Sequence, residues 1–454
     1  MKAAFHTLGC KVNQYETEAM RQQFETDGFD IVDENDFADV YIINTCTVTN
    51  IADRKSRQYI RRMKKHNPDA IIAVTGCYAQ VKPQELAQLP EVDIVAGTGE
   101  KNSLLSYVKE FLQKKRPQMH IKSYDELCTY QDRGIICSME SRTRAYIKIQ
   151  EGCDRFCAYC LIPFARGQVR SRDPEEIIRE AKVLIDGGFK ELILTGINTA
   201  LYGTEESFAE LYPDWAGDEG IESVIKALND IDGNFRIRLS SLEPAVVNAQ
   251  YVKRLMKYDK LCHHLHLSAQ SGSDHVLSLM NRPYTASQYM DIVKVLRECD
   301  PLYGVTTDII AGFPGETDYD FEESLRLIKD AEFCKVHPFR YSKREGTAAA
   351  EMRDQIRSEV KNRRMALLTQ AGEAASKEFF KKSIGDVRTV LFEEQEFIDE
   401  GDGHDECSCR GETYITGYTD NYIKVYVPGG RENLNSFKEV KLLEIYKDGM
   451  KGEI

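Results

Sequence analysis

Short apolar runs alternate with longer amphipathic segments along the first quarter of the chain. The runs are typical of buried strands, and the segments between them repeat apolar residues at helical spacing. This strand–helix alternation predicts a parallel sheet with right-handed crossovers. The expected strands are Ala3–Leu8, Val40–Asn44, Ala70–Thr75 and Asp93–Ala96, and the expected helices are about Tyr15–Thr26 and Asp53–Lys65.

The same alternation returns over residues 144–372, where helical patterns separate six apolar runs. The first helix is well marked, because Asp173 suits the N-cap, Pro174 suits the first helical position and Gly187-Gly188 suits the end. Six strand–helix units predict a partial (β/α)6 version of the eight-unit barrel, with active-site residues on the loops after the strands. The expected strands are Ala145–Gln150, Lys190–Thr195, Phe235–Ser240, His263–Ser268, Val305–Ala311 and Lys335–Arg340.

Strand-like alternation over residues 375–454 predicts a small C-terminal β-barrel, a type often used on RNA. Residues 116–143 have weak periodicity and are expected to form a linker with some extended structure. The predicted fold class is an α/β multidomain protein: a flavodoxin-like parallel-sheet domain over residues 1–115, the linker, the partial barrel and the β-barrel. The expected β-barrel strands are Val387–Phe392, Tyr414–Tyr418, Tyr422–Val427 and Val440–Tyr446, in which Tyr414, Tyr418, Tyr422 and Tyr426 either stack on bases or are half-buried strand aromatics.

Composition and charge indicate the cellular compartment of the protein and the class of chemistry that it performs. The chain has no charged leader followed by an apolar run, and no stretch approaches the length of a membrane span, so we expect a cytoplasmic protein with no membrane contact. We also expect a monomer. Thirteen cysteines point to metal binding or catalysis before disulfides. The net charge of −13 disfavours indiscriminate nucleic-acid binding, although the basic segment 54–65 is either an RNA contact or a solvated helix face.

Three cysteines, Cys153, Cys157 and Cys160, lie in one loop with the spacing C-x3-C-x2-C. Their thiolates are soft ligands suited to an iron–sulfur cluster. No fourth ligand follows in the loop, so one iron would stay open to a substrate. An incomplete zinc site and three unrelated thiols are the alternatives. The loop follows the first barrel strand, where active-site residues are expected.

Three other cysteines, Cys10, Cys46 and Cys77, each follow a predicted strand of the first domain. Parallel strands all point one way, so these residues should gather at the carboxyl edge of the sheet, where open α/β sheets bind ligands. The pattern predicts a second three-thiolate site. The alternative is three buried small hydrophobes.

The loop cysteines, with the aromatic Tyr159 before the third, resemble the signature of the radical S-adenosylmethionine (SAM) enzymes. The resemblance implies that residues 144–372 form a radical-SAM core. It implies a [4Fe-4S] cluster on Cys153, Cys157 and Cys160, SAM chelated by the open iron, and an electron donor such as flavodoxin or ferredoxin. It also implies SAM contacts at the barrel strand ends, where ordinary loop capping is the alternative for each residue: Tyr159, Thr195, Gly196, Asn198, Arg238, Ser240, Ser268, Gln270, Asp308 and Ile310.

Two departures from that signature matter. A Gly-Gly-Glu after the second strand is replaced by Thr195-Gly196-Ile197, which leaves open the group that holds the amino end of SAM. The G-x-I-x-G-x-x-E of the fifth strand has Asp308 for its first glycine and Glu316 one place late.

Taken together, the three parts resemble the methylthiotransferases, radical-SAM enzymes that insert a methylthio group into a C–H bond. The opening Thr7-Leu8-Gly9-Cys10-Lys11-Val12-Asn13-Gln14-Tyr15-Glu16 is similar to the bacterial MtaB branch. The resemblance implies an auxiliary [4Fe-4S] cluster on Cys10, Cys46 and Cys77, and a C-terminal TRAM domain that docks the substrate. It also implies a tRNA substrate with N6-threonylcarbamoyladenosine at position 37, methylthiolated at C2 of the adenine. The source of the sulfur stays open.

Two alternatives compete with that function. The first is methylthiolation of a ribosomal protein side chain, against which the MtaB-like opening counts. The second is a non-catalytic iron–sulfur RNA-binding protein, which two open three-ligand sites disfavour. The acidic loop over residues 198–220 either roofs the active site or decorates the surface. Cys407 and Cys409 have no third ligand beside them and stay unassigned.

Overall fold

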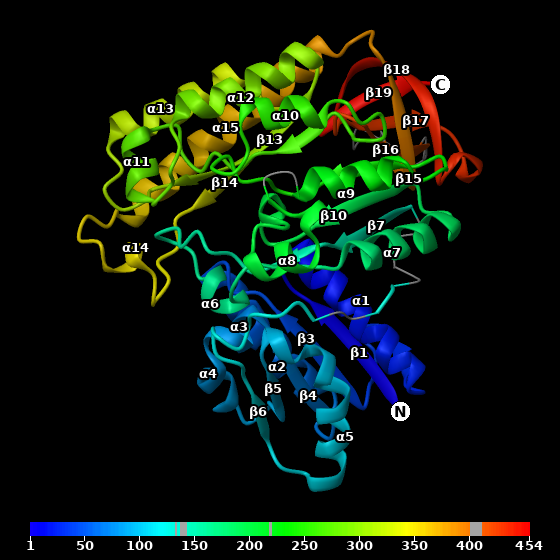
Figure 1. Cartoon of the computed structure of the whole chain (residues 1–454), viewed down its shortest axis with the longest axis vertical. Coiled ribbons are helices and arrows are strands. Elements are labelled where there is room, and N and C mark those ends of the chain that lie inside the picture. Colours follow the sequence, from blue (N-terminus) through cyan, green and yellow to red (C-terminus); the bar gives the residue numbers. More distant parts are fainter. Residues whose placement is uncertain (132–133, 137–142, 218–219, 400–410) are drawn as a thin grey trace, which may run out of the picture.

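The computed structural model describes residues 1–131, 134–136, 143–217, 220–399 and 411–454. Its three parts follow one another along the molecule (Figure 1). The N-terminal sheet domain lies at one end, an α/β domain lies in the middle, and a β-barrel packs beside the far end of that middle domain.

The first domain is a parallel sheet with strand order β2-β1-β3-β4-β5-β6. The order of its first five strands is that of the flavodoxin-like folds. Alternate strand residues pack on opposite faces, so that Ile42 and Ile43 belong to different core clusters. The elements are β1 (Lys2–Thr7), α1 (Lys11–Thr26), β2 (Asp30–Val32), β3 (Val40–Thr45), α2 (Asn50–His66), β4 (Ile71–Gly76), α3 (Cys77–Val81), α4 (Pro83–Ala87), β5 (Ile94–Ala96), α5 (Leu104–Lys114) and β6 (Gln118–His120).

The four expected strands and both expected helices of this domain are confirmed, whereas its two edge strands were not predicted. Each edge strand has three residues, which is too short for a period of two to show. Strand β6 lies in the segment that was expected to be a linker. It pairs with β5 and forms an edge of the sheet, in keeping with the extended structure expected within that segment.

The middle domain contains six parallel strands in two three-stranded sheets, ordered β11-β10-β7 and β12-β13-β14. Single bridges, including Leu242 with Leu267, connect the two sheets. The strands are β7 (Arg144–Lys148), β10 (Glu191–Thr195), β11 (Arg236–Leu239), β12 (His264–His266), β13 (Gly304–Ala311) and β14 (Lys335–Arg340), with a separate pair β8 (Gln150–Glu151) and β9 (Arg170–Ser171). The helices are α6 (Ile162–Arg166), α7 (Pro174–Asp186), α8 (Glu206–Leu211), α9 (Gly220–Asn229), α10 (Ala249–Leu255), α11 (Asp274–Leu279), α12 (Ala286–Cys299), α13 (Asp318–Ala331), α14 (Ala348–Glu351) and α15 (Ser358–Lys382).

The expected cap of α7 is confirmed. The side chain of Asp173 accepts from the backbone N–H of Glu175 at 2.7 Å and from that of Glu176 at 3.4 Å. These bonds satisfy two N–H groups that have no partner within the helix.

Side chains along the six strands alternate between two environments. One set, such as Ile147, Leu192 and Leu265, belongs to the core under the helices. The other set faces the space between the two sheets and is polar on most strands. Among these inward residues, His266, Asp308 and His337 are partly exposed, although most of their strand neighbours on the helix side are buried. Solvent therefore reaches the interior of this domain.

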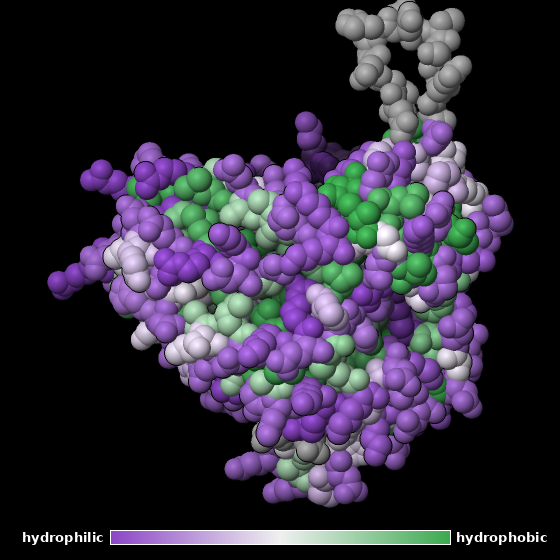
Figure 2. All heavy atoms as spheres, turned by 90° about the horizontal axis from the view of Figure 1, so that it is seen from above, coloured by the Kyte–Doolittle hydropathy of each residue, from purple (hydrophilic) through white to green (hydrophobic). Residues whose placement is uncertain are grey.

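The C-terminal part is a closed barrel with strand order β15-β16-β17-β19-β18. The four expected strands are confirmed, and the fifth, β19, was not predicted. Figure 2 shows the molecule from the end at which this barrel lies. Hydrophilic residues cover most of that surface, and smaller hydrophobic areas lie between them. The strands are β15 (Val387–Asp399), β16 (Gly411–Thr419), β17 (Lys424–Pro428), β18 (Ser436–Tyr446) and β19 (Gly449–Glu453).

The turn between β16 and β17 packs closely against the middle domain. Arg238 donates to the carbonyl oxygens of Thr419 and Asp420, each at 3.2 Å. A side chain on Gly304 is not tolerated, because its Cβ would lie 2.1 Å from the carbonyl oxygen of Asn421. The barrel is therefore built into the middle domain and is not a loosely tethered module.

Candidate active site

The three cysteines of the first domain lie at adjoining strand ends, as expected. Cys10 precedes α1, Cys46 follows β3, and Cys77 begins α3 after β4. Gly9, at a φ of +109°, lets the first two approach, because a Cβ on it would lie 2.7 Å from the Cβ of Cys46. Cys10 is exposed, whereas Cys46 and Cys77 are buried.

Asn13 fixes these strand ends relative to one another. Its amide donates to the carbonyl of Leu8 at 2.7 Å and to that of Thr45 at 3.1 Å. Asn44 donates to the carbonyl of Asn13 at 2.9 Å, and Thr45 donates to the carbonyl of Thr75 at 2.5 Å. The residues immediately before the cysteines therefore form one hydrogen-bonded layer.

The other three cysteines lie in the loop between β8 and α6. The N–H of Cys153 donates to the carbonyl of Gly167 at 3.1 Å, and the N–H of Ile162 lies 3.4 Å from the Sγ of Cys160. Gly152 opens the loop at a φ of +77°, and a Cβ there would lie 1.7 Å from the carbonyl oxygen of Gln168. All three cysteines are partly exposed.

The thiols within each set influence one another. Burial, together with the nearby Cys77 and Cys10, raises the pKa of Cys46 to about 12. Burial and the neighbouring Cys157 likewise raise the pKa of Cys160 to about 12. Thiols close enough to oppose each other's ionisation are stabilised as thiolates when metal replaces their protons.

No three His, Cys, Asp or Glu side chains in the described part of the chain converge on one metal ion. That geometry belongs to a mononuclear site, whereas each cysteine of an iron–sulfur cluster binds a different iron. Two sets of three soft ligands, each without a fourth, fit such clusters.

The two cysteine sets are joined through Arg166, in the helix that follows the loop. Helix α6 packs on α3, which begins at Cys77. The Nε–H of Arg166 donates to the Sγ of Cys77 at 3.3 Å. The Nη1 of Arg166 donates to Glu16 and Glu151, each at 2.7 Å, and its Nη2 donates to the Oδ1 of Asn13 at 2.5 Å. This fully buried cation is therefore bound through all three of its nitrogens.

A buried ion network surrounds that contact at the boundary of the first two domains. Glu16, on α1, also accepts from Lys148 of β7 at 2.7 Å and from Lys101. Lys148 in turn donates to Glu151 at 2.8 Å. Buried charges are tolerated when they are paired and hydrogen-bonded in this way. Removing one partner leaves the remaining charge buried and unpaired.

Two candidate SAM contacts carry buried polar atoms that have no partner in the described structure. Both side-chain atoms of Asn198 and the Oγ of Ser240 are in this state. An unsatisfied buried polar atom is costly, so each group suits a polar ligand that is absent here. The amino, carboxylate and ribose groups of SAM are of that chemistry.

Gln150 shapes the neighbouring loop, a role that no motif in the sequence indicates. Its Oε1 accepts from the backbone N–H groups of Ile197 at 3.1 Å and Asn198 at 2.9 Å. Its amide donates to the carbonyls of Glu151 and Gly152. Thr195 and Gly196 are thereby held beside the start of the cysteine loop.

Ser268, Asp308 and His266 form a hydrogen-bonded group on β12 and β13. The Oγ of Ser268 donates to Asp308 at 3.0 Å, and the Nε2 of His266 lies 3.1 Å from the same carboxylate. Burial alone would raise the pKa of Asp308, but these hydrogen bonds outweigh burial and lower it. Gln270, at a φ of +63°, exchanges backbone hydrogen bonds with Asp308 and Ile310.

Two further candidate SAM contacts, Arg238 and Tyr159, form hydrogen bonds with other side chains in this structure. Arg238 pairs with Glu191 at 3.0 Å and donates to the β16–β17 turn. Tyr159 is partly buried, and its hydroxyl accepts from Arg282 at 2.9 Å. Arg282 also pairs with Glu243. The spacing of residues along the chain could not identify Arg282 as a partner of the cysteine loop. The SAM contacts of Arg238 and Tyr159 stay predictions.

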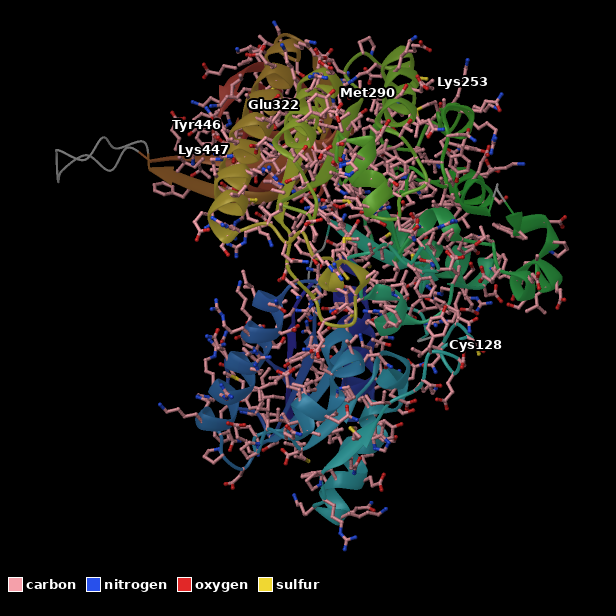
Figure 3. All side chains as sticks on the ribbon, turned by 90° about the vertical axis from the view of Figure 1, so that its left-hand side faces the viewer. Cys128, Lys253, Met290, Glu322, Tyr446 and Lys447 are labelled. Carbon is pink, nitrogen blue, oxygen red and sulfur yellow. The ribbon has the colours of Figure 1, made fainter. Side chains whose placement is uncertain are left out.

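The expected base-stacking tyrosines are largely committed to packing. Tyr414 and Tyr426 are buried, and Tyr422 stacks on His264 with ring centroids 4.4 Å apart. A different residue, Tyr446, is partly exposed, with the Nζ of Lys451 lying 4.7 Å from its ring centroid. Figure 3 shows Tyr446 beside Lys447 on the barrel.

Other sequence features contribute less to this site. Several basic residues of α2 are paired, including Arg57 with Glu85 at 2.8 Å. Phe208, in the acidic loop, packs into the core of the middle domain. Cys128 is exposed and points outward, apart from either set (Figure 3). Cys407 and Cys409 lie outside the described residues. In the described part of the chain no helix is long and apolar enough to cross a membrane.

Two sequence families match separate parts of the chain. Residues 2–97 match the uncharacterized protein family UPF0004, and residues 147–328 match the radical SAM superfamily. These ranges contain the two cysteine sets, one in each.

Curated relatives match nearly the whole length. The chain is 41% identical over 442 residues to the threonylcarbamoyladenosine tRNA methylthiotransferase MtaB of Bacillus subtilis, covering 97% of this chain and 93% of that protein. It is 38% identical over 401 residues to the protein of the same name from Aquifex aeolicus, covering 88% and 95%. It is also 33% identical over 457 residues to a tRNA-2-methylthio-N(6)-dimethylallyladenosine synthase of Clostridium botulinum, covering 98% and 95%.

Among solved structures, the chain resembles the radical S-adenosylmethionine methyltransferase TsrM from Kitasatospora setae. The TM-score is 0.56 at 13% identity, covering 88% of this chain and 79% of that one. At this identity the likeness concerns the fold alone.

Proposed function

The chain belongs to the MtaB group of radical-SAM methylthiotransferases, and from this premise we propose that it methylthiolates N6-threonylcarbamoyladenosine in tRNA. The reaction installs sulfur and methyl at C2 of the adenine, at position 37 beside the anticodon. SAM and [4Fe-4S] clusters are the cofactors of this chemistry. Relatives that act on this nucleoside support the tRNA substrate over a ribosomal protein side chain.

The observation that carries the proposal is the pair of three-cysteine sets joined through Arg166. A radical enzyme that only split SAM would need one set. A transfer of sulfur to carbon needs a second group that presents sulfur close to the carbon radical. The contact of α6 with α3 brings the two sets to one boundary between domains.

We assign the parts as follows. Cys153, Cys157 and Cys160 hold the cluster that binds SAM, and Cys10, Cys46 and Cys77 hold the auxiliary cluster. When bound, these groups supply a 5′-deoxyadenosyl radical, the sulfur and its methyl group. C2–H of adenine has no useful acidity, so a radical is needed in place of a positioned base.

The chain's own residues hold and shield the reactants. Asn198 and Ser240 offer unsatisfied polar atoms to SAM, and Gln150 fixes the loop that carries Asn198. Ser268 and Asp308 form a fixed polar wall on the opposite sheet. The first domain covers the open side of the middle domain through α1, which packs against β7, and so limits the access of water to the radical.

We further propose that the C-terminal barrel is a TRAM domain and that its face around Tyr446 contacts the tRNA. Tyr446 is partly exposed between Lys447 and Lys451, whose ammonium groups lie 5.6 and 4.7 Å from its ring centroid. An aromatic ring flanked by cations suits both a base and its phosphate.

The test is anaerobic turnover of reconstituted enzyme on tRNA that carries threonylcarbamoyladenosine, followed by mass spectrometry of the nucleosides. We expect the 2-methylthio nucleoside to appear with SAM and reductant and to be absent without either. Product on dimethylallyladenosine tRNA alone, or no nucleoside product together with modification of a ribosomal protein, would overturn the assignment. Loss of the nucleoside from the tRNA of a deletion strain checks the same point in the cell.

A further inference from the structure

Helix α2 of the first domain carries two groups of lysine and arginine side chains. One group is paired with acidic residues of the same domain: Arg57 with Glu85 at 2.8 Å, Arg61 with Glu91 at 3.9 Å and Lys64 with Asp93 at 3.3 Å. The other group forms no ion pair within the part of the chain that the structure describes. We call this second group the outer strip, and its members are Arg54, Lys55, Arg62 and Lys65.

The outer strip occupies a single face of α2. With 3.6 residues per turn, its four positions fall within a sector of about 100° around the helix axis. All four side chains are exposed, whereas Tyr59 and Met63 on the other side of the helix pack into the core of the domain. Asp53, the acidic residue of α2, is buried and does not share the exposed face. From Arg54 to Lys65 the helix rises about 16 Å.

The charge of this face runs against that of the whole protein, whose net charge is −13. Arg62 and Lys65 are three residues apart on one helix face, where like charges repel each other. Arg62 has only the uncharged Asn35 as a hydrogen-bond partner, at 2.9 Å. A row of cations without acidic neighbours favours a polyanion, and a length of about 16 Å spans several successive phosphates of a nucleic-acid strand.

The position of the outer strip relates it to the candidate active site. Helix α2 begins four residues after Cys46, and Asn50 at its start donates to the carbonyl of Lys343 at 3.1 Å. Arg344, from the same loop of the middle domain, donates to Asp53 at 2.8 Å. That loop follows β14, the edge strand of its sheet. One end of the outer strip is therefore fixed beside the loop that carries Cys46, at the boundary of the two domains.

Two exposed apolar side chains lie between Cys46 and the outer strip. Val48 is 59% exposed and Ile51 is 50% exposed. Apolar side chains contact bases, whereas cations contact phosphates. The order along the chain is thus a cysteine of the auxiliary set, an apolar stretch and a row of cations, which suits a strand whose backbone lies on α2 and whose base reaches towards Cys46.

An acidic electron-donor protein is the other partner that these cations could attract. Its electron is needed at the cluster that we propose on Cys153, Cys157 and Cys160, and that loop belongs to the middle domain. The outer strip leads instead to the loop of Cys46, on the first domain. Its position therefore favours the RNA over the electron donor.

We propose that the outer strip of α2 binds backbone phosphates of the tRNA anticodon stem-loop and positions the strand that carries the reacting base. The inference rests on the proposed function, and it adds a second contact surface for the substrate to the barrel face around Tyr446. Contacts with phosphates carry no information about the base, so the outer strip adds affinity whether or not the adenosine is modified.

The test measures the salt dependence of binding, by fluorescence anisotropy of labelled anticodon stem-loops with reconstituted full-length protein from about 50 to about 200 mM KCl. The strip variant combines Arg54→Gln, Lys55→Gln and Lys65→Gln. The matched control combines Lys182→Gln, Lys253→Gln and Lys257→Gln, which remove the same charge from exposed positions of the middle domain. Figure 3 shows Lys253 on the side of the view away from Tyr446. Iron content and thermal unfolding are compared for all three proteins.

Each phosphate contact contributes roughly 0.7–0.9 to the slope of log affinity against log salt concentration. We expect the strip variant to reduce this slope by about 2 and the control to leave it unchanged. The affinity ratio of wild type to strip variant should therefore fall about sixteenfold between the two salt concentrations. Stem-loops with threonylcarbamoyladenosine and with unmodified adenosine should lose affinity by the same factor.

An unchanged slope in the strip variant overturns the proposal and leaves α2 with a solvated face, as does an equal change in the control. Cleavage of SAM is also measured with reduced flavodoxin and with dithionite. If the strip variant loses only the flavodoxin-supported activity and keeps its RNA affinity, the outer strip serves the electron donor and the proposal is wrong. If the triple variant unfolds, Lys55→Gln alone decides, with an expected reduction of the slope by about 0.7–0.9.

Two outcomes separate this inference from the function on which it rests. A protein whose RNA binding depends on the outer strip, but which forms no methylthiolated nucleoside, refutes the function and leaves the phosphate site standing. A protein that forms the nucleoside while its strip variant keeps the full salt slope refutes the site and leaves the function.

Discussion

Arg166 donates a hydrogen bond from its Nε to the Sγ of Cys77 across 3.3 Å, although 89 residues separate the two in sequence. The arginine belongs to the helix after the radical-SAM loop, and the cysteine belongs to the first domain. One side chain therefore connects the helix after the cysteine loop to Cys77, and its charge and N–H act directly on a cysteine that we propose as a ligand of the auxiliary cluster.

Replacing Arg166 by Met should lower the reduction potential of the auxiliary cluster. A cation and an N–H group at a ligand sulfur stabilise the reduced, more negative cluster. We expect at least a tenfold change in the one-electron equilibrium, about 59 mV, in a redox titration followed by electron paramagnetic resonance. The background is Cys153→Ala, Cys157→Ala and Cys160→Ala, so that only one cluster contributes.

Arg172→Met is the matched control for that experiment. Arg172 is equally buried and pairs with Glu180, and its hydrogen-bond partners among the described residues include no cysteine of either set. Both variants strand a buried carboxylate and should lose about 3–5 kcal/mol of stability. An unchanged potential in the Arg166 variant, or an equal shift in both, would contradict the specific role of the hydrogen bond.

Deleting the barrel after residue 383 should destabilise the middle domain. The resemblance to methylthiotransferases implies only that this part docks the substrate. In the structure, Phe379 and Phe380 of α15 belong to the barrel core, and Arg238 donates to the β16–β17 turn. We expect the truncated protein to aggregate or to lose its cooperative thermal transition. A truncated protein that melts like the full chain and cleaves SAM would show that this docking is dispensable.

The stabilising effect of Asp320 should depend on pH. Its carboxylate accepts from Ser273 at 2.6 Å, from Thr317 at 2.7 Å and from His275 at 3.1 Å. Burial alone would raise the pKa of Asp320, but these hydrogen bonds prevail and lower it from 3.8 to about 2. A carboxyl whose pKa is depressed in the folded state contributes stability above its unfolded pKa, and that contribution is lost as the pH falls from about 4 towards 2.

Urea unfolding of cluster-free protein compares wild type with Asp320→Asn at pH 6, 4 and 3. At pH 6 the variant should be less stable by about 1 kcal/mol, as for the loss of a helix cap. The difference should shrink as the pH falls. A difference that stays constant over this range would exclude the carboxylate charge as its cause.

The cysteines of the loop should account for half of the iron. Two [4Fe-4S] clusters correspond to about eight irons in reconstituted protein. Changing Cys153, Cys157 and Cys160 to Ala should leave about four and abolish cleavage of SAM. Iron analysis and the assay of 5′-deoxyadenosine measure both effects. Loss of all iron in this variant would show that the two sets are not independent.

The local pattern of apolar and polar residues predicted the elements whose side chains are buried over a full face. Strands β3 and β4 are buried along their whole length, and both were expected nearly to the residue. Strands β2 and β6 have three residues at sheet edges and carry no readable period. Their pairing is decided by neighbours that lie far along the chain.

The candidate site divides in the same way. The six cysteines proposed as cluster ligands could be found because spacing and strand ends are local features. Arg166 and Gln150 could not be assigned roles, because each acts on residues of another element or domain. Tyr422 was expected to be a possible base-stacking residue, yet it stacks on His264 in the interface with the middle domain.

The central claim is that Cys10, Cys46 and Cys77 hold the cluster that serves sulfur transfer. The deciding measurement is anaerobic turnover on threonylcarbamoylated tRNA with all three changed to Ala, counting 5′-deoxyadenosine and methylthiolated nucleoside per folded molecule. We predict that 5′-deoxyadenosine still forms while methylthiolated product is absent, because the loop cysteines and the SAM contacts are intact. Methylthiolated product at the wild-type rate per folded molecule would contradict the account.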